Sequence, residues 1–117
     1  MTSHESSTYK PPMFDGTIFS FWKVRTRTYL LALGADVWDV VETGYTKPVV
    51  LASKDDKLEF SFNAKAMNVI LNGLAESEFV KVMHLDSAKA MWDKLINSYE
   101  GNEKVRDAKL QTYRLKF

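Results

Sequence analysis

Two pairs of acidic residues have a spacing that could support general acid–base catalysis. Asp36 and Asp39 lie three residues apart on a short predicted helix, and Asp55 and Asp56 are adjacent at the start of a longer one. Paired carboxylates can donate and accept protons at a reacting bond. Acidic side chains in the first turn of a helix, however, interact favourably with the helix dipole and stay solvated. We therefore interpret both pairs as solvated helix-start residues and predict no catalytic residues.

Cysteine and histidine offer no further chemistry. The chain has no cysteine, which excludes disulfides, thiol nucleophiles and cysteine-containing zinc sites. Its two histidines are isolated from each other, and His84 follows an apolar run at a predicted helix end, where a cation interacts favourably with the helix dipole. No phosphate-binding loop, nucleophile elbow, zinc-protease or calcium-loop pattern is present. We expect no metal, no cofactor, no small-molecule substrate and no enzymatic activity.

Basic side chains gather in two places that could contact RNA or a protein partner. The first cluster, Lys23, Arg25 and Arg27, either decorates the polar face of a helix or binds phosphate or an acidic partner. The second cluster has five basic residues against one acidic residue between positions 104 and 117: Lys104, Arg106, Lys109, Arg114 and Lys116. Apolar residues alternate with them, which predicts a basic amphipathic helix. That helix either packs on the domain's own core or presents an interaction surface.

The three tryptophans, Trp22, Trp38 and Trp92, allow two interpretations. Exposed aromatic side chains interleaved with Lys and Arg stack on the bases of single-stranded nucleic acids. All three, however, fall on apolar faces at helical spacing. The formal net charge of only +1 also argues against a nucleic-acid-binding module. We therefore predict that the tryptophans pack in the core.

The elements that position these side chains are predicted to be helices, since apolar residues recur every three to four positions. The first helix follows a turn at residues 15–17, where Asp15 or Thr17 can cap it, and ends at Gly34. Its predicted apolar stripe comprises Ile18, Trp22, Thr26, Tyr29 and Leu33. A short helix over residues 36–41 comes next. Its β-branched residues would also suit a strand, but it has no pairing partner.

Further helices follow a connector at residues 44–52. Ser53 and Asp56 resemble a capping box that starts a helix of about 20 residues, ending at Asn72-Gly73. Its predicted stripe comprises Leu58, Phe62, Ala66, Val69, Ile70 and Leu74. A helix over residues 76–83 comes next, and Ser87 caps another. The stripe of that helix comprises Ala88, Met91, Trp92, Leu95, Ile96 and Tyr99. We expect residues 100–102 to break it and a final helix to begin near Glu103.

The expected fold class is all-α, a single compact bundle of five to six helices. A chain of 117 residues suits one domain. We expect residues 1–12 to form a flexible N-terminal tail and residues 13–117 to form the helical domain, with its last helix, about 103–117, truncated at Phe117. No targeting segment is visible, and no apolar stretch approaches the roughly 20 residues that a bilayer requires.

Several short motifs follow one another from about residue 13 to the end of the chain. They are Phe14-Asp15-Gly16, Phe21-Trp22-Lys23, residues 33–41 with Gly44-Tyr45, residues 63–66, residues 88–95 with Tyr99-Glu100-Gly101, and Val105 with residues 108–111, ending at Phe117. In this order they resemble the N-terminal region of the Gag polyprotein of copia-type LTR retrotransposons, especially those of plants. The resemblance implies a fold like the N-terminal domain of a retroviral capsid.

The motif residues coincide with the predicted apolar stripes, Phe21 included, so the motifs are chiefly a packing signature. The motif positions expected in the core are Phe14, Trp22, Trp38, Met91, Trp92, Leu95, Tyr99, Leu110 and Phe117. Such a signature identifies a fold rather than a chemical site, and function follows from the family.

The resemblance implies a structural protein that self-associates through helix faces into a virus-like particle around the element's RNA. Its partners would be further copies of itself and, weakly, RNA, with no membrane, and its place the cytoplasm, with a nuclear presence left open. Gag proteins commonly carry a zinc knuckle that binds nucleic acid, but this chain has no cysteine to form one. Two alternatives stay open: a domesticated Gag remnant that binds a host protein or RNA, and direct RNA binding through the two basic clusters.

Overall fold

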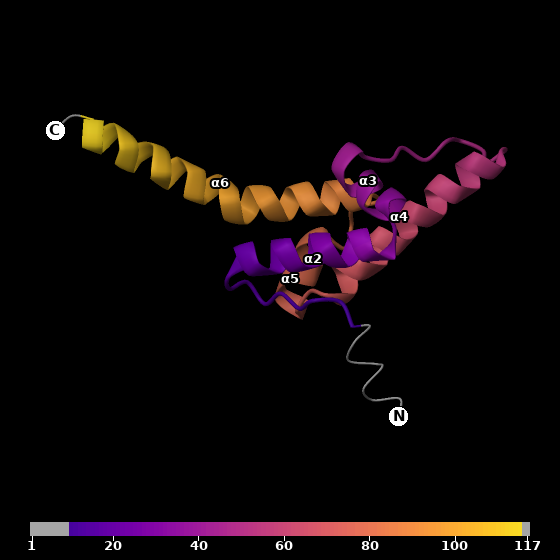
Figure 1. Cartoon of the computed structure of the whole chain (residues 1–117), viewed down its shortest axis with the longest axis horizontal. Coiled ribbons are helices and arrows are strands. Elements are labelled where there is room, and N and C mark those ends of the chain that lie inside the picture. Colours follow the sequence, from indigo (N-terminus) through magenta and orange to yellow (C-terminus); the bar gives the residue numbers. More distant parts are fainter. Residues whose placement is uncertain (1–9, 116–117) are drawn as a thin grey trace, which may run out of the picture.

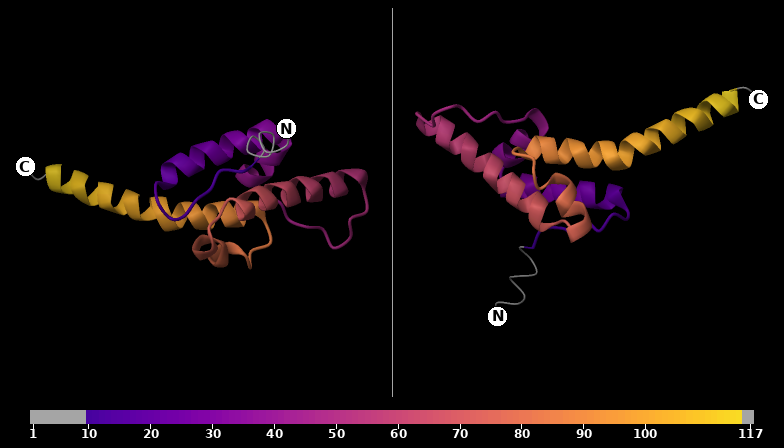
Figure 2. Two further views of the ribbon diagram at one scale, coloured as in Figure 1. Left: turned by 90° about the horizontal axis from the view of Figure 1, so that it is seen from below. Right: turned by 180° about the vertical axis from the view of Figure 1, so that it is seen from behind.

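The computed structural model describes the backbone of residues 10–115 and the side chains of residues 10–101. This part of the chain folds into five helices: α2 (Phe19–Leu33), α3 (Ala35–Thr43), α4 (Lys54–Asn72), α5 (Glu76–Val82) and α6 (Ala88–Leu115). The predicted all-α class is therefore confirmed. The N-terminal half of α6 packs among the other helices, whereas its C-terminal half extends away from them (Figures 1 and 2).

The core forms where α2, α3, α4 and α6 meet. α3 packs against each of the other three, and α4 also packs against α6. The largest fully buried apolar side chains come from every helix and from the segment before α2: Phe14, Leu30, Val37, Val41, Ile70, Val82, Met91 and Leu95. Burial of such a side chain contributes about 1.5–3 kcal/mol. This shared core is what stabilises helices as short as α3, which would be marginal in isolation.

The buried stripe of α2 differs from the predicted one. It consists of Phe19, Trp22, Thr26 and Leu30, whereas Ile18 and Leu33 are exposed. Phe21, a motif residue that we placed among the stripe positions, is 62% exposed. Those predictions were wrong because α2 has apolar residues on more than one side. Two neighbouring sets of its residues therefore fit the helical period, and the sequence does not show which set is buried. The rings of Phe14 and Tyr99 select Phe19, whose ring lies 5.4 and 5.3 Å from theirs.

The predicted cap of α2 is also wrong. Asp15 Oδ1 accepts hydrogen bonds from the backbone N–H and the hydroxyl of Thr17, at 3.0 and 2.6 Å, so both side chains belong to the preceding turn. Ile18 occupies the N-cap position without a side-chain hydrogen bond, at φ 50° and ψ 58°. This left-handed conformation is rare for a β-branched residue. It holds the Ile18 side chain outward, where it is 63% exposed.

The capping box at the start of α4 is confirmed. Ser53 Oγ accepts a hydrogen bond from Asp56 N at 3.0 Å, and the Asp56 carboxylate accepts one from Ser53 N at 3.2 Å. The helix ends at Gly73, as predicted. On its predicted stripe, Ala66, Val69 and Ile70 are buried, but Leu58 is exposed. The first turns of α4 lie beyond the other helices (Figure 1), which explains that difference.

A short extended segment ties the N-terminal side of the domain to the junction of α4 and α5. Phe14 N donates to Gly73 O at 2.7 Å, and Ala75 N donates to Phe14 O at 2.9 Å. Trp22 Nε1 donates to Pro12 O at 3.1 Å. We call residues 12–14 the N-terminal strap. It places the Phe14 ring in the core, where it contacts rings of α2 and α6.

α6 starts as predicted but does not end as predicted. Ser87 Oγ accepts a hydrogen bond from Ala90 N at 3.1 Å, which caps the helix. The expected break at residues 100–102 is absent, and the helix runs without interruption to Leu115. A helical glycine costs only about 1 kcal/mol. Glu100 is held by an ion pair to α2, and good helix formers follow Gly101, so one glycine is not sufficient to end the helix.

Candidate functional site

The predicted basic cluster of α2 is largely engaged within the molecule. Lys23 Nζ lies 2.8 Å from the Glu100 carboxylate of α6, in a half-buried ion pair. The Arg27 guanidinium lies 5.4 Å from the centre of the Trp38 ring, a cation–π contact with α3. Arg25 is exposed. Two of the three cations therefore join α2 to its neighbours, and the cluster does not present three uncommitted charges to an anionic ligand.

The second basic cluster lies on the C-terminal half of α6. The backbone of residues 104–115 is helical and extends beyond the packed helices (Figure 1). The side chains of Lys104, Arg106, Lys109 and Arg114 lie outside the described residues, as does the side chain of the motif residue Leu110. Lys116 and Phe117 lie outside them entirely.

The remaining motif residues meet in one aromatic and aliphatic cluster. Trp22, Trp38 and Trp92 are all buried, together with Phe14, Met91 and Leu95. The Trp92 ring links the other two tryptophans, with ring centres 5.5 Å from Trp22 and 5.4 Å from Trp38. Tryptophan side chains packed in this way cannot stack on nucleic-acid bases without unfolding the core. The base-stacking interpretation therefore has no support from their placement.

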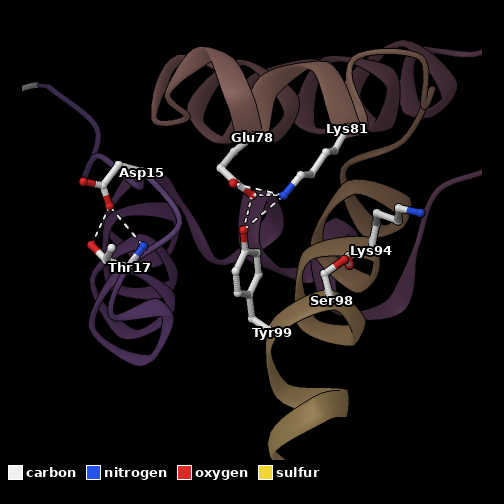
Figure 3. Close-up of polar contacts among 7 residues, drawn as sticks. All are labelled: Asp15, Thr17, Glu78, Lys81, Lys94, Ser98 and Tyr99. Carbon is white, nitrogen blue, oxygen red and sulfur yellow. Dashed lines mark hydrogen bonds and ion pairs between the residues drawn. The ribbon is translucent and has the colours of Figure 1, made fainter.

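Glu78, Lys81 and Tyr99 form a polar triad (Figure 3). It lies beside this cluster, since the Tyr99 ring is 4.9 Å from that of Phe14. Glu78, from α5, is only 4% exposed. Its carboxylate accepts a hydrogen bond of 2.5 Å from the Tyr99 hydroxyl of α6 and one of 3.1 Å from Lys81 Nζ. Burial, and then the bond to Glu78, raise the pKa of Tyr99, while the hydrogen bonds to Glu78 and Tyr99 raise the pKa of Lys81. Tyr99 therefore stays neutral and Lys81 stays charged near neutral pH. The hydrogen bonds of the triad fasten α5 to α6.

The triad explains two motif residues at once. Gly16 adopts φ +101°, and a side chain there would bring its Cβ within 3.2 Å of a Glu78 carboxylate oxygen. Gly16 therefore lets the turn of residues 15–17 pass close beside the triad. Figure 3 shows Asp15 and Thr17 of this turn to the left of the triad. Sequence reasoning missed Glu78, which lies in the predicted helix over residues 76–83. Its spacing of three residues from Lys81 was the available signal.

Asn63 is a second residue that sequence reasoning missed. Its side chain, buried within α4, accepts a hydrogen bond from Ala88 N at 2.9 Å through Oδ1. It therefore satisfies a free N–H group at the first turn of α6, alongside Ser87. The available signal was a polar residue in phase with the buried positions Ala66 and Ile70. A motif residue here joins two helices that are distant in sequence.

The acidic pairs do not assemble a reactive centre. Asp36, Asp39 and Asp55 are exposed, while Asp56 is used in the capping box. His84 is exposed on the surface. Within residues 10–101, no three histidine, aspartate or glutamate side chains come together as a metal site. Of the helices in the described part of the chain, none has the length and apolar character to cross a membrane.

The chain was compared with protein families, curated proteins and solved structures. No curated protein and no solved structure shows a significant match to the chain. One protein family does match, described as gag-polypeptide of LTR copia-type, over residues 26–116. The match begins after Phe14 and Trp22, but the structure packs both against residues inside it, so they belong to the same folded unit. The chain belongs to the copia-type Gag polypeptide family, a family of structural proteins.

Proposed function

We propose that the chain is a self-associating capsid domain of a copia-type Gag polypeptide, which contributes to a virus-like particle around the element's RNA and catalyses no reaction. The observation that carries the proposal is the family match over residues 26–116. The all-helical fold supports it, because its core is built from the family-like motifs. The proposed place of action is the cytoplasm, in particles, with a nuclear presence also compatible.

Self-association is tested by sedimentation velocity over a wide protein concentration range, followed by negative-stain electron microscopy of the most concentrated samples. The proposal expects a sedimentation coefficient that rises with concentration. Expression together with the neighbouring sequence of the element's open reading frame is expected to give closed particles. A monomer at every concentration, with no particles from the longer chain, would overturn the proposal.

RNA contact is proposed for the C-terminal half of α6 rather than for α2. The support is that five basic residues lie at positions 104–116, whereas Lys23 and Arg27 of α2 already contact Glu100 and Trp38. Phosphate contacts make affinity fall steeply with salt. We expect Lys109→Gln with Arg106→Gln to weaken binding of single-stranded RNA at low salt and to flatten the salt dependence. The matched control, Lys54→Gln with Lys57→Gln at two exposed residues of α4, should leave both unchanged. Binding that is undetectable at low salt, or insensitive to salt, would remove RNA from the proposal.

A domesticated Gag remnant is the alternative from another functional class. It shares the fold but serves as a host binding module for a protein or RNA. Genomic context separates the two: an open reading frame that runs into protease and integrase supports the element. Fusion to an unrelated domain supports domestication.

A further inference from the structure

An exposed apolar patch surrounds the start of α2. Met13, Ile18 and Phe21 are 66%, 63% and 62% exposed, and all three line a cavity of about 270 Å³. Asp15 and Arg25 line the same cavity. Neighbouring apolar side chains that stay in water while a core forms beside them are typical of an interaction surface. We call these five residues the α2 patch.

Ile18 gives a second, independent sign of function. It is the non-glycine residue with positive φ in the described part of the chain, and its β-branched side chain makes that conformation unfavourable. In the isolated chain the side chain remains exposed, so its own burial does not offset this strain. Backbone outliers of this kind concentrate at binding sites, where the strain positions a contact. Here it presents an apolar side chain beside Phe21.

The charges of the α2 patch make it complementary to itself. Asp15 accepts two hydrogen bonds from Thr17, which lower the pKa of its carboxyl and keep it ionised. Arg25 makes no ion pair or cation–π contact with the described residues, in contrast to Lys23 and Arg27. One negative and one positive charge therefore accompany one apolar centre. A two-fold rotation brings unlike charges of two such surfaces together.

We propose that the α2 patch is an isologous contact between two copies of this chain. Ile18 and Phe21 pack across the two-fold axis, and Arg25 of each copy pairs with Asp15 of the other. The inference rests on the proposed self-association and assigns a surface to it. The occupant is a second copy because the patch carries both members of the charge pair, whereas an acidic or basic partner would call for a single sign.

Mixing two charge variants tests the pairing. Asp15→Arg alone and Arg25→Asp alone each place like charges at both ends of the contact. Because every substitution acts twice across a two-fold axis, we expect each variant to dimerise at least about tenfold more weakly than the wild type. In an equimolar mixture, the heterodimer has unlike charges at both ends. Sedimentation velocity should therefore show association restored towards the wild-type level.

Two apolar substitutions keep the test valid if a charge variant folds poorly. Phe21→Ser should weaken dimerisation at least about tenfold with little change in Tm, since the side chain is exposed in the monomer. Ile18→Gly should weaken dimerisation and yet raise Tm, because glycine adopts positive φ without strain. The matched control is Val50→Ser, at a residue 67% exposed in the connector, which should change neither.

The outcomes separate the surface from the function. If the wild type associates but Phe21→Ser and Ile18→Gly associate equally well, and the mixture shows no rescue, the α2 patch is not the contact and self-association stands. If the wild type is monomeric at every concentration, the proposed function fails together with the surface. Weakened single variants with rescue on mixing establish the isologous contact.

Discussion

The substitution Gly73→Ala tests how strongly the N-terminal strap is fixed to the junction of α4 and α5. A Cβ on Gly73 would lie 2.3 Å from the carbonyl oxygen of Pro12, far inside ordinary contact of 3.4–4 Å. Gly73 has φ −91° and ψ 0°, which alanine also adopts, so the backbone conformation adds little. Nearly the whole effect must therefore come from the collision with the strap.

The size of the effect follows from the contacts that the strap makes. Moving Pro12 by about 1 Å breaks or lengthens three hydrogen bonds, those joining Phe14 to Gly73 and Ala75 and that joining Trp22 to Pro12. Each of these bonds contributes about 0.5–1.5 kcal/mol net. If the strap stays in place instead, the bonds are kept and strain from overpacking costs about 1–3 kcal/mol. We expect a loss of about 2–4 kcal/mol in the free energy of unfolding.

Urea unfolding followed by tryptophan fluorescence measures this loss, since Trp22 reports on the strap. The matched control is Gly101→Ala, because a Cβ on this helical residue would meet nothing within 4 Å. The free energy of unfolding of that variant should rise by about 0.5–1 kcal/mol, because alanine is the better helix former. The free energy of unfolding of Gly73→Ala could instead differ from that of the wild type by less than about 0.5 kcal/mol, which is the order of the experimental error. That result, or an equal response of both variants, would show that the strap is not packed as described.

Three further predictions concern single polar groups. Thr26→Val should stabilise the fold by about 1 kcal/mol in urea unfolding, because the buried Thr26 hydroxyl has no hydrogen-bond partner among the described residues; a loss would show that the hydroxyl has one. Tyr99→Phe should cost about 1–3 kcal/mol because Glu78 loses a donor. Tyr45→Phe should be neutral or stabilising, because the Tyr45 hydroxyl is buried and has no partner within the part of the chain that the structure describes; equal responses of the two variants would contradict the triad. The hydrogen bond from Ser53 N lowers the pKa of Asp56 in the folded state, so the stabilising effect of this carboxylate is present at neutral pH and is lost as pH falls below about 5. The urea midpoint of Asp56→Asn should therefore vary less with pH over that range than the midpoint of the wild type, and an equal variation with pH would refute the assignment.

Features that depend on neighbouring residues could be predicted from the sequence. The capping box of Ser53 and Asp56 spans one helical turn, and the buried stripe of α6 follows the helical period directly. The motifs led to the copia-type Gag family, which the family match confirms. The capping box and the buried stripe depend only on local hydrogen bonds and on the helical period, so they can be predicted without any tertiary contact.

Features that depend on distant residues could not be predicted. The phase of α2 is decided by Phe14 and Tyr99, which lie outside that helix. Glu78 and Asn63 resembled surface residues until α6 supplied their partners, Tyr99 and Ala88. The basic cluster of α2 resembled a ligand site for the same reason, since Glu100 is 77 residues from Lys23. In each case a polar side chain has a hydrogen-bond or ion-pair partner that is distant in the sequence and becomes a neighbour only in the folded chain.

The weight-average mass of the wild-type chain as a function of concentration tests the central claim most directly. Sedimentation equilibrium at physiological salt gives this mass without any variant or label. We predict that it rises above the monomer value of 13.4 kDa through that of a dimer, and that it does so reversibly on dilution. A mass that stays at the monomer value up to the highest attainable concentration would contradict the assignment of this chain as a self-associating capsid domain.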